Sequence, residues 1–114
     1  MSNARIIKKY PNRRLYDTGR GRYITLEDVQ RLAQEGTDFI VIDHRTDEEI
    51  THNILLQALS ALEEGQPQML SKRLLVELIR RYGAGSVAST GRLLEVAVGL
   101  PHQEEGRGTA AAPS

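Results

Sequence analysis

The sequence predicts an α+β fold, in which a small N-terminal β-ribbon and helix module is followed by a C-terminal helical hairpin. Short β-branched runs separated by turn signals dominate residues 5–50. Apolar residues at helical spacing follow over 54–62 and again over 70–98. The 114 residues suffice for one small domain with an appendage. We therefore expect three parts, which are a β-β-α-β-β-α module over 5–66, a helical segment over 67–103 and a disordered tail over 104–114.

Residues 5–25 are predicted to form a basic β-hairpin or ribbon. The run over 5–10 (RIIKKY) has β-branched residues and partial alternation, which favours a strand. Pro11 and Asn12 then mark a turn, because proline fixes φ and asparagine tolerates the left-handed region. Extended structure resumes after this turn, and a flexible Gly-Arg-Gly-Arg loop leads to a further short run at 23–24.

A capped helix and a buried strand are expected next. Thr25 is a good N-cap, and Asp28 can return a hydrogen bond to it in a capping box. Gly36 supplies the left-handed residue that ends the helix. The continuous apolar run over 39–42 is typical of a strand, and we expect residues 50–51 to pair back on it as a short strand.

The remainder of the chain carries apolar side chains at helical spacing. A first stripe, ended by Gly65 and Pro67, comprises Ile54, Leu55, Ala58, Leu59 and Leu62. Two amphipathic helices are expected over 70–82 and 87–98, joined by a glycine hinge. Such a pair cannot bury both apolar faces alone, so it folds onto the first module or onto another subunit of a homo-oligomer. The residues expected at this oligomerisation or interaction surface are Leu74, Leu75, Leu78, Ile79 and Tyr82.

The composition argues against an enzyme, a cofactor site and a membrane span. The absence of cysteine excludes disulfides, thiolate metal ligands and a cysteine nucleophile. The three histidines are too dispersed for a metal-ligand spacing, and the acids over 43–49 are more typical of a solvated turn than of a divalent-metal site. No apolar run approaches the roughly 18 residues of a membrane span, and the N-terminus lacks a signal-peptide apolar segment. We expect a cytoplasmic protein without metal or cofactor.

Positive charge is concentrated at the N-terminus of a chain with no net charge. Residues 1–22 hold seven Lys or Arg and one acid, whereas residues 23–66 hold two bases and ten acids. Three tyrosines stand between the N-terminal charges. Lys and Arg neutralise phosphates, Asn and Arg donate to base edges, and tyrosine hydroxyls bind phosphate oxygens. On a two-stranded ribbon narrow enough for the major groove, we predict a double-stranded DNA interface of Lys8, Lys9, Tyr10, Asn12, Arg13, Arg14, Tyr16, Arg20 and Arg22.

Two structural explanations compete with the DNA interface. The basic end can pack on the acidic middle of the same chain or of a neighbour, which would consume its charge. The tyrosines can be core or hairpin-packing residues, and we expect this of at least one of the three. Composition alone leaves these alternatives open.

The string Arg5-Ile-Ile-Lys-Lys-Tyr-Pro-Asn-Arg-Arg-Leu-Tyr-Asp-Thr18 resembles the N-terminal signature of the polyhydroxyalkanoate synthesis repressor family, the PHB accumulation regulators. The likeness continues through residues 23–29, 38–43, 50–51 and 54–57. Residues 68–98 are similar, more loosely, to the family's accumulation-regulatory segment.

The resemblance implies a transcriptional repressor that binds promoter DNA through its N-terminal module and associates with polyhydroxyalkanoate polymer or granules. In that family the regulator represses genes for granule-coating phasins, polymer binding releases it from DNA, and its members are oligomeric. The loop over 19–22 carries more charge than the family pattern, and the chain lacks the longer C-terminal tail of many members, so polymer sensing is implied less directly than DNA binding. The alternative function is a granule- or protein-interaction module, or an oligomerisation module, without direct DNA readout.

Overall fold

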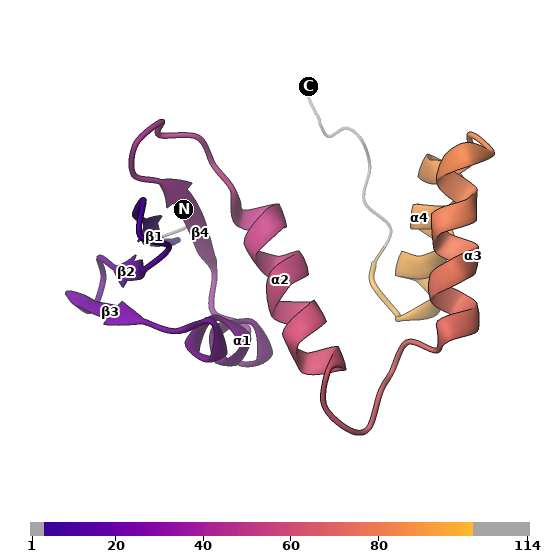
Figure 1. The fold of residues 1–114 in the computed structure, drawn as a ribbon, viewed down its shortest axis with the longest axis horizontal. Coiled ribbons are helices and arrows are strands. Elements are labelled where there is room, and N and C mark those ends of the chain that lie inside the picture. The colour runs from indigo at the N-terminus through magenta and orange to yellow at the C-terminus, as the bar shows by residue number, and fades with distance from the viewer. Residues whose placement is uncertain (1–3, 102–114) are drawn as a thin grey trace. The chain divides into compact units, whose positions relative to one another are not determined.

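Four strands and two helices form the first part of the chain (Figure 1). In chain order these are β1 (Arg5–Lys9), β2 (Leu15–Asp17), β3 (Arg22–Ile24), α1 (Leu26–Gln34), β4 (Phe39–Asp43) and α2 (Thr51–Glu63), and the second part holds α3 (Lys72–Gly83) and α4 (Val87–Ala97). This computed structural model describes residues 4–101, and its two units divide between Met69 and Leu70. The predicted α+β class is confirmed. The tail predicted over 104–114 lies outside the described residues.

The strands form a single sheet with the order β3-β2-β1-β4. β1 pairs antiparallel with β2 on one edge and parallel with β4 on the other, where Arg5 is opposite Phe39 and Lys9 is opposite Asp43. The β-hairpin predicted over 5–25 is therefore confirmed in β1 and β2, but it is not a separate two-stranded ribbon, because β3 and β4 extend it on both sides into a four-stranded sheet with β1 as a central strand. Local patterns gave no sign of this, because the pairing of β1 with β4 joins segments that are far apart in the sequence.

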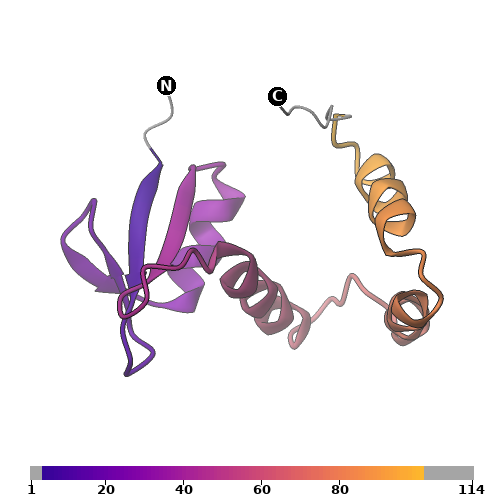
Figure 2. The same cartoon turned by 90° about the horizontal axis from the view of Figure 1, so that it is seen from above.

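The core lies between one face of the sheet and the two helices, which are on the same side of it (Figure 2). Side chains of a strand alternate between faces, so Ile7 is fully buried while its neighbour Ile6 is 39% exposed on the open face. The same alternation buries Val41 in β4. The buried apolar residues are Ile7, Leu15, Val29, Phe39, Val41, Ile54 and Ala58.

Helix α1 begins and ends as the sequence predicts. The Thr25 hydroxyl accepts from the Asp28 amide, and the Asp28 carboxylate accepts from the Thr25 amide at 2.8 Å, which completes the capping box. Gly36 follows the helix with φ of 76°, the left-handed conformation that glycine adopts at no steric cost.

The short strand expected at residues 50–51 is wrong, because Thr51 is the first residue of α2. The Thr51 hydroxyl accepts from the Val41 amide at 2.8 Å, and the Ile50 amide donates to the Val41 carbonyl at 2.7 Å. These two bonds satisfy the outer edge of β4 around Val41, so the backbone can turn into a helix there. Only an isolated bridge between Ile42 and Glu49 continues the strand pairing.

The second unit is a pair of helices. The Ser71 hydroxyl caps α3 by accepting from the Leu74 amide at 3.0 Å, and Gly85, with φ of 75°, follows α3 where the hinge was predicted. The Arg81 guanidinium donates to the Thr90 hydroxyl at 3.3 Å and so links α3 to α4. No residue of either helix is buried.

Candidate nucleic-acid interface

The turn between β1 and β2 carries two exposed cations of the N-terminal module, Arg13 and Arg14. The Tyr10 amide donates to the Arg14 carbonyl at 2.9 Å, and the Arg13 amide donates to the Tyr10 carbonyl at 2.8 Å. Asn12 accepts from the Arg14 amide through its side-chain oxygen at 3.0 Å, which leaves its NH2 group available as a donor. Arg13 has φ of 69°, a left-handed conformation that costs roughly 1 kcal/mol or more in a residue with a Cβ.

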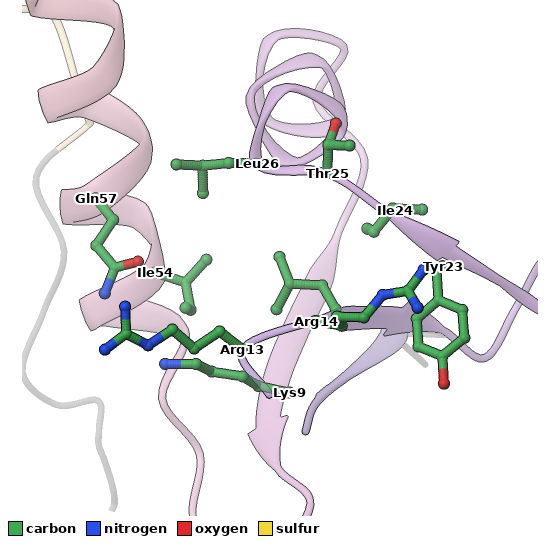
Figure 3. Close-up of a pocket in the computed structure, with 10 residues that line it drawn as sticks. Lys9, Arg13, Arg14, Tyr23, Ile24, Thr25, Leu26, Ile54 and Gln57 are labelled. Atoms are coloured by element: carbon green, nitrogen blue, oxygen red, sulfur yellow. The ribbon is translucent and has the colours of Figure 1, made fainter. Parts of the chain in front are cut away.

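An open groove of about 790 Å³ lies beside this turn, between the sheet and the helices (Figure 3). Lys9 and Arg13 extend side by side toward Gln57 of α2, whereas Arg14 extends to the other side, toward Tyr23. The groove is lined by the cations Lys9, Arg13 and Arg14, by the apolar residues Leu15, Ile24, Leu26 and Ile54, and by Tyr23, Thr25 and Gln57. It thus joins three positive charges to an apolar floor, and no carboxylate lines it.

The cations of this groove, Lys9, Arg13 and Arg14, belong to none of the ion pairs among the described residues. Within residues 4–101, the ion pairs join Arg5 to Asp17, Arg31 to Asp28, and Arg80 and Arg81 to Glu77. The charge of one groove cation, Lys9, acts on the carboxyl of Asp43. The Arg45 and Thr46 amides lower the pKa of the Asp43 carboxyl, and the charges of Arg45 and Lys9 lower it further. The explanation in which the basic end packs on acidic residues of its own unit therefore fails for Arg13 and Arg14.

The three tyrosines gather on the open face of the sheet next to the turn. Pairing of β2 with β3 sets Tyr16 opposite Tyr23, and their ring centroids lie 5.1 Å apart in an edge-to-face arrangement. The centroid of the Tyr10 ring lies 6.4 Å from that of Tyr16 and 4.3 Å from that of the His44 ring. The Arg14 guanidinium lies 4.0 Å over the Tyr23 ring, a cation–π contact. The tyrosines are thus packed on one another but remain outside the core, and Tyr23 is 48% exposed.

The nine predicted DNA-binding residues fall into three places. Lys9, Arg13 and Arg14 line the groove, with Asn12 on the turn beside them. The open face carries Tyr10, Tyr16 and Lys8, which is paired with Tyr16 in the strand register. Arg20 and Arg22 line a separate depression of about 140 Å³ together with Asp17, Asp28 and Glu35. The structure brings the first two sets around one turn and sets the third apart among carboxylates.

Sequence reasoning missed two residues of this region, His44 and Gln57. His44 follows β4 and reaches Tyr10 because β4 runs parallel to β1, and its amide donates to the Lys9 carbonyl at 2.8 Å. Gln57 lies on the exposed side of α2 and lines the groove. Neither has a local sequence signal, since only tertiary packing places them near the turn.

The loop that carries Arg20 and leads to Arg22 at the start of β3 is built around a buried carboxylate. Asp17 is 2% exposed and accepts from the Gly19 and Arg20 amides at 2.9 and 3.3 Å. Its other oxygen receives the Arg5 guanidinium at 3.4 Å. This arrangement fixes the geometry of the loop, and the Asp17 carboxylate neutralises the charge of Arg5.

The predicted interaction residues of the second unit all lie on α3. Leu74 and Leu78 are half-buried, and a cavity of about 180 Å³ between α3 and α4 is lined by Leu78 and Tyr82 among others. Leu75, Ile79 and Tyr82 are exposed, at 44%, 70% and 72%. Their role in oligomerisation stays a prediction.

The described residues hold neither a candidate metal cluster nor a membrane-spanning helix. Across residues 4–101, no three or more His, Asp or Glu gather in a way that could hold a metal ion. None of the helices in that range is both long enough and apolar enough to cross a bilayer.

Comparisons with known proteins connect this geometry to a family. Residues 6–66 match the family model described as the PHB/PHA accumulation regulator DNA-binding domain. Over 100 residues, the chain is 46% identical to an uncharacterized protein of Allochromatium vinosum and 45% identical to one of Thiocystis violacea named for the phbA 5′ region. Each match covers 88% of this chain, but only 65% and 72% of the respective relative. No solved structure matches. The groove and the tyrosine cluster both lie within the matched DNA-binding domain, and the chain belongs to the family of PHB/PHA accumulation regulators.

Proposed function

We propose that this regulator is a repressor of polyhydroxyalkanoate and phasin genes that holds duplex DNA in the groove of Lys9, Arg13 and Arg14. One observation carries the proposal, which is that three cations with no ion pair inside residues 4–101 line one groove, and that no acid is among the described residues that line it. Like charges repel one another, so a polyanion that neutralises this cluster relieves the repulsion and binds favourably. The protein acts by binding and not by catalysis.

The residues around the groove make different kinds of contact with DNA. Lys9 and Arg13 neutralise backbone phosphates, which positions the protein without reading sequence. Asn12 offers its NH2 group to a base acceptor from the tip of the turn, because its oxygen is already engaged by the backbone. Arg14 is held by the Tyr23 ring and loses less side-chain freedom on binding than a free arginine would.

The binding test is a titration of a fluorescent promoter duplex at several salt concentrations. Each phosphate contact that is lost makes the slope of log affinity against log salt shallower by about 0.9, so Arg13→Ala/Arg14→Ala is expected to remove nearly 2. The matched control, Arg20→Ala/Arg22→Ala, removes the same charge from the depression that holds Asp17, Asp28 and Glu35. It should change the slope by less than half as much. Equal losses in both variants would refute the assignment of the groove.

Polymer-controlled release from DNA is the second part of the proposal. It is supported by the resemblance of the chain to the repressor family, and the name of the Thiocystis violacea relative refers to the phbA region. Release requires polymer to bind the DNA-free state more tightly than the DNA-bound state, since equal affinity shifts no equilibrium. Amorphous polymer granules added to a preformed protein–DNA complex should therefore free the duplex. A complex that stays intact while the protein binds the granules would contradict release.

The alternative function, an interaction module without DNA readout, is favoured by the second unit alone. In α3 and α4 no apolar side chain is buried, so these helices offer a large apolar surface. Granule co-sedimentation of Ile79→Asp beside the parent tests this role. Lost sedimentation together with unchanged DNA binding would assign the two functions to separate units.

A further inference from the structure

The open face of the sheet carries aromatic and cationic side chains. Both helices of the first unit pack on the other face, and no helix among residues 4–69 covers this one (Figure 2). Side chains of a strand alternate between faces, so the open face holds the strand residues next to the buried ones. These residues are Ile6, Lys8, Tyr16, Tyr23, Ile40 and Ile42. Tyr10 and His44, which follow β1 and β4, adjoin them beside the β1–β2 turn. We call Tyr10, Tyr16, Tyr23 and His44 the aromatic face.

The rings of the aromatic face are open to a flat ligand. Tyr16 and Tyr23 meet edge to face, with an angle of 77° between their planes, so they do not close on one another as a stacked pair would. The Tyr23 side chain is 48% exposed. The His44 ring is tilted by 37° against the Tyr10 ring, and His44 is exposed. A ligand that stacks on these rings removes their apolar area from water, which favours binding.

Two cations beside the rings favour a polyanion as this ligand. Lys8 stands opposite Tyr16 in the strand register, and the Arg14 guanidinium lies 4.0 Å from the centroid of the Tyr23 ring. Neither cation belongs to an ion pair among residues 4–101. Glu49 is bridged to β4, at the edge of the sheet opposite to β3. A nucleic acid strand offers both flat rings for stacking and negative charge for the two cations.

Stacking on these rings requires unpaired bases. In a duplex, neighbouring base pairs cover both faces of each base, so a protein ring does not reach them. Unpaired bases stack on aromatic rings and on arginine guanidinium planes, and some four-stranded sheets bind single strands through aromatic side chains that stack about two or three bases. Such stacking accepts every base, because each base has a π face. The aromatic face therefore fits a single strand rather than a duplex.

We propose that the aromatic face binds the unpaired bases of single-stranded DNA that continues from the duplex held in the groove. Tyr23 and Arg14 belong to both surfaces, since they also line the groove, and Arg14 extends toward Tyr23 (Figure 3). A strand that leaves the groove therefore meets the aromatic face directly. This continuity assigns DNA and not RNA as the occupant. The continuity rests on the proposed function of the groove, whereas binding of a free single strand does not.

The first test measures binding of a fluorescently labelled oligothymidine to the full-length chain by anisotropy. Tyr23→Leu keeps an apolar side chain but removes the ring, so the affinity should fall about tenfold, as for the loss of one stacked base. Tyr23→Phe keeps the ring and should restore the affinity. Circular dichroism checks that both variants fold. Equal affinities of the parent and Tyr23→Leu would overturn the proposal, and so would tighter binding of a ribose strand of the same length, which would assign the face to RNA.

The emission of the tyrosines separates stacking from attraction of phosphates. The chain has four Tyr and no Trp, and three of the Tyr belong to the aromatic face, so its emission reports mainly on these rings. Unlabelled oligothymidine should quench this emission when its bases stack on the rings. An abasic strand with the same number of phosphates should bind more weakly and quench less. An abasic strand that binds as tightly as oligothymidine would overturn the proposal, since phosphates alone would then explain binding.

A duplex with a single-stranded tail separates this inference from the proposed function of the groove. The parent should bind the tailed duplex about tenfold more tightly than the blunt duplex. His44→Ala should lose much of this advantage, and the matched control His52→Ala, which changes an exposed histidine of α2, should keep it. Equal binding of the tailed and blunt duplexes by the parent would overturn the proposed continuity.

Arg13→Ala identifies which of the two surfaces fails. Arg13 lines the groove and is not part of the aromatic face, so this change should weaken blunt-duplex binding more than oligothymidine binding. Loss of duplex binding in Arg13→Ala, together with equal oligothymidine binding by the parent and Tyr23→Leu, would refute the aromatic face and keep the groove. The reverse pattern would refute the groove and keep the single-strand site.

Discussion

Replacement of Arg13 by glycine should stabilise the fold and weaken DNA binding at the same time. Arg13 adopts φ of 69° at the turn, a conformation that costs a residue with a Cβ roughly 1–2 kcal/mol and glycine nothing. Glycine also gains conformational entropy in the unfolded chain, which offsets about 0.5–1 kcal/mol of this relief. The expected net gain in the free energy of unfolding is about 0.5–1 kcal/mol. We infer that the strained conformation persists because it directs the guanidinium into the groove.

Urea unfolding and the salt dependence of duplex binding check the two halves of this prediction. Arg13→Gly should raise the urea midpoint, while the salt slope becomes shallower by about 0.9, the share of one phosphate contact. Asp47→Gly is the control, because Asp47 has φ of 62° in an exposed turn outside the groove. It should give a similar gain in stability without weakening DNA binding. A variant Arg13→Gly that binds DNA with an unchanged slope would show that the residue serves only the turn.

Three further predictions concern the fold that supports the site. Thr51→Val removes the hydroxyl that accepts a buried amide of β4 at 2.8 Å, so the free energy of unfolding should fall by about 1–3 kcal/mol in urea titrations. The backbone hydrogen bond from Thr25 lowers the pKa of the Asp28 carboxyl, so this carboxylate stabilises the protein above its unfolded pKa, and the contribution is lost as acid titrates the folded group. Asp28→Asn should therefore lose stability near neutral pH and lose less near pH 3, and a pH-independent loss would contradict the role of this carboxylate in the capping box. Ile7→Ala should cost about 2–5 kcal/mol and Ile6→Ala much less, since only the first is fully buried; equal costs would place the core on the wrong face of the sheet.

The elements that rest on local chemistry were predictable from the sequence. The Pro11–Asn12 turn, the capping box at Thr25 and the glycine that follows α1 depend on residues close to one another in the chain. Their hydrogen bonds join residues within a few positions of one another, so short-range patterns sufficed. The strand expected at residues 50–51 was wrong because the structure there depends on a contact that is distant in the sequence. Thr51 begins a helix because its hydroxyl meets the Val41 amide of a strand ten residues earlier, which no local pattern records.

The candidate site divides in the same way between sequence and fold. The sequence by itself determined which residues are cationic and aromatic, that they cluster before residue 25, and which family they resemble, because these are properties of composition and order. Only the tertiary structure decided that Arg13 and Arg14 share an acid-free groove with Lys9 and that Arg20 and Arg22 do not. The physical reason is that the parallel pairing of β1 with β4 and the packing of α1 and α2 on one face set the distances between charges. Coulomb energy depends on those distances and not on separation along the chain.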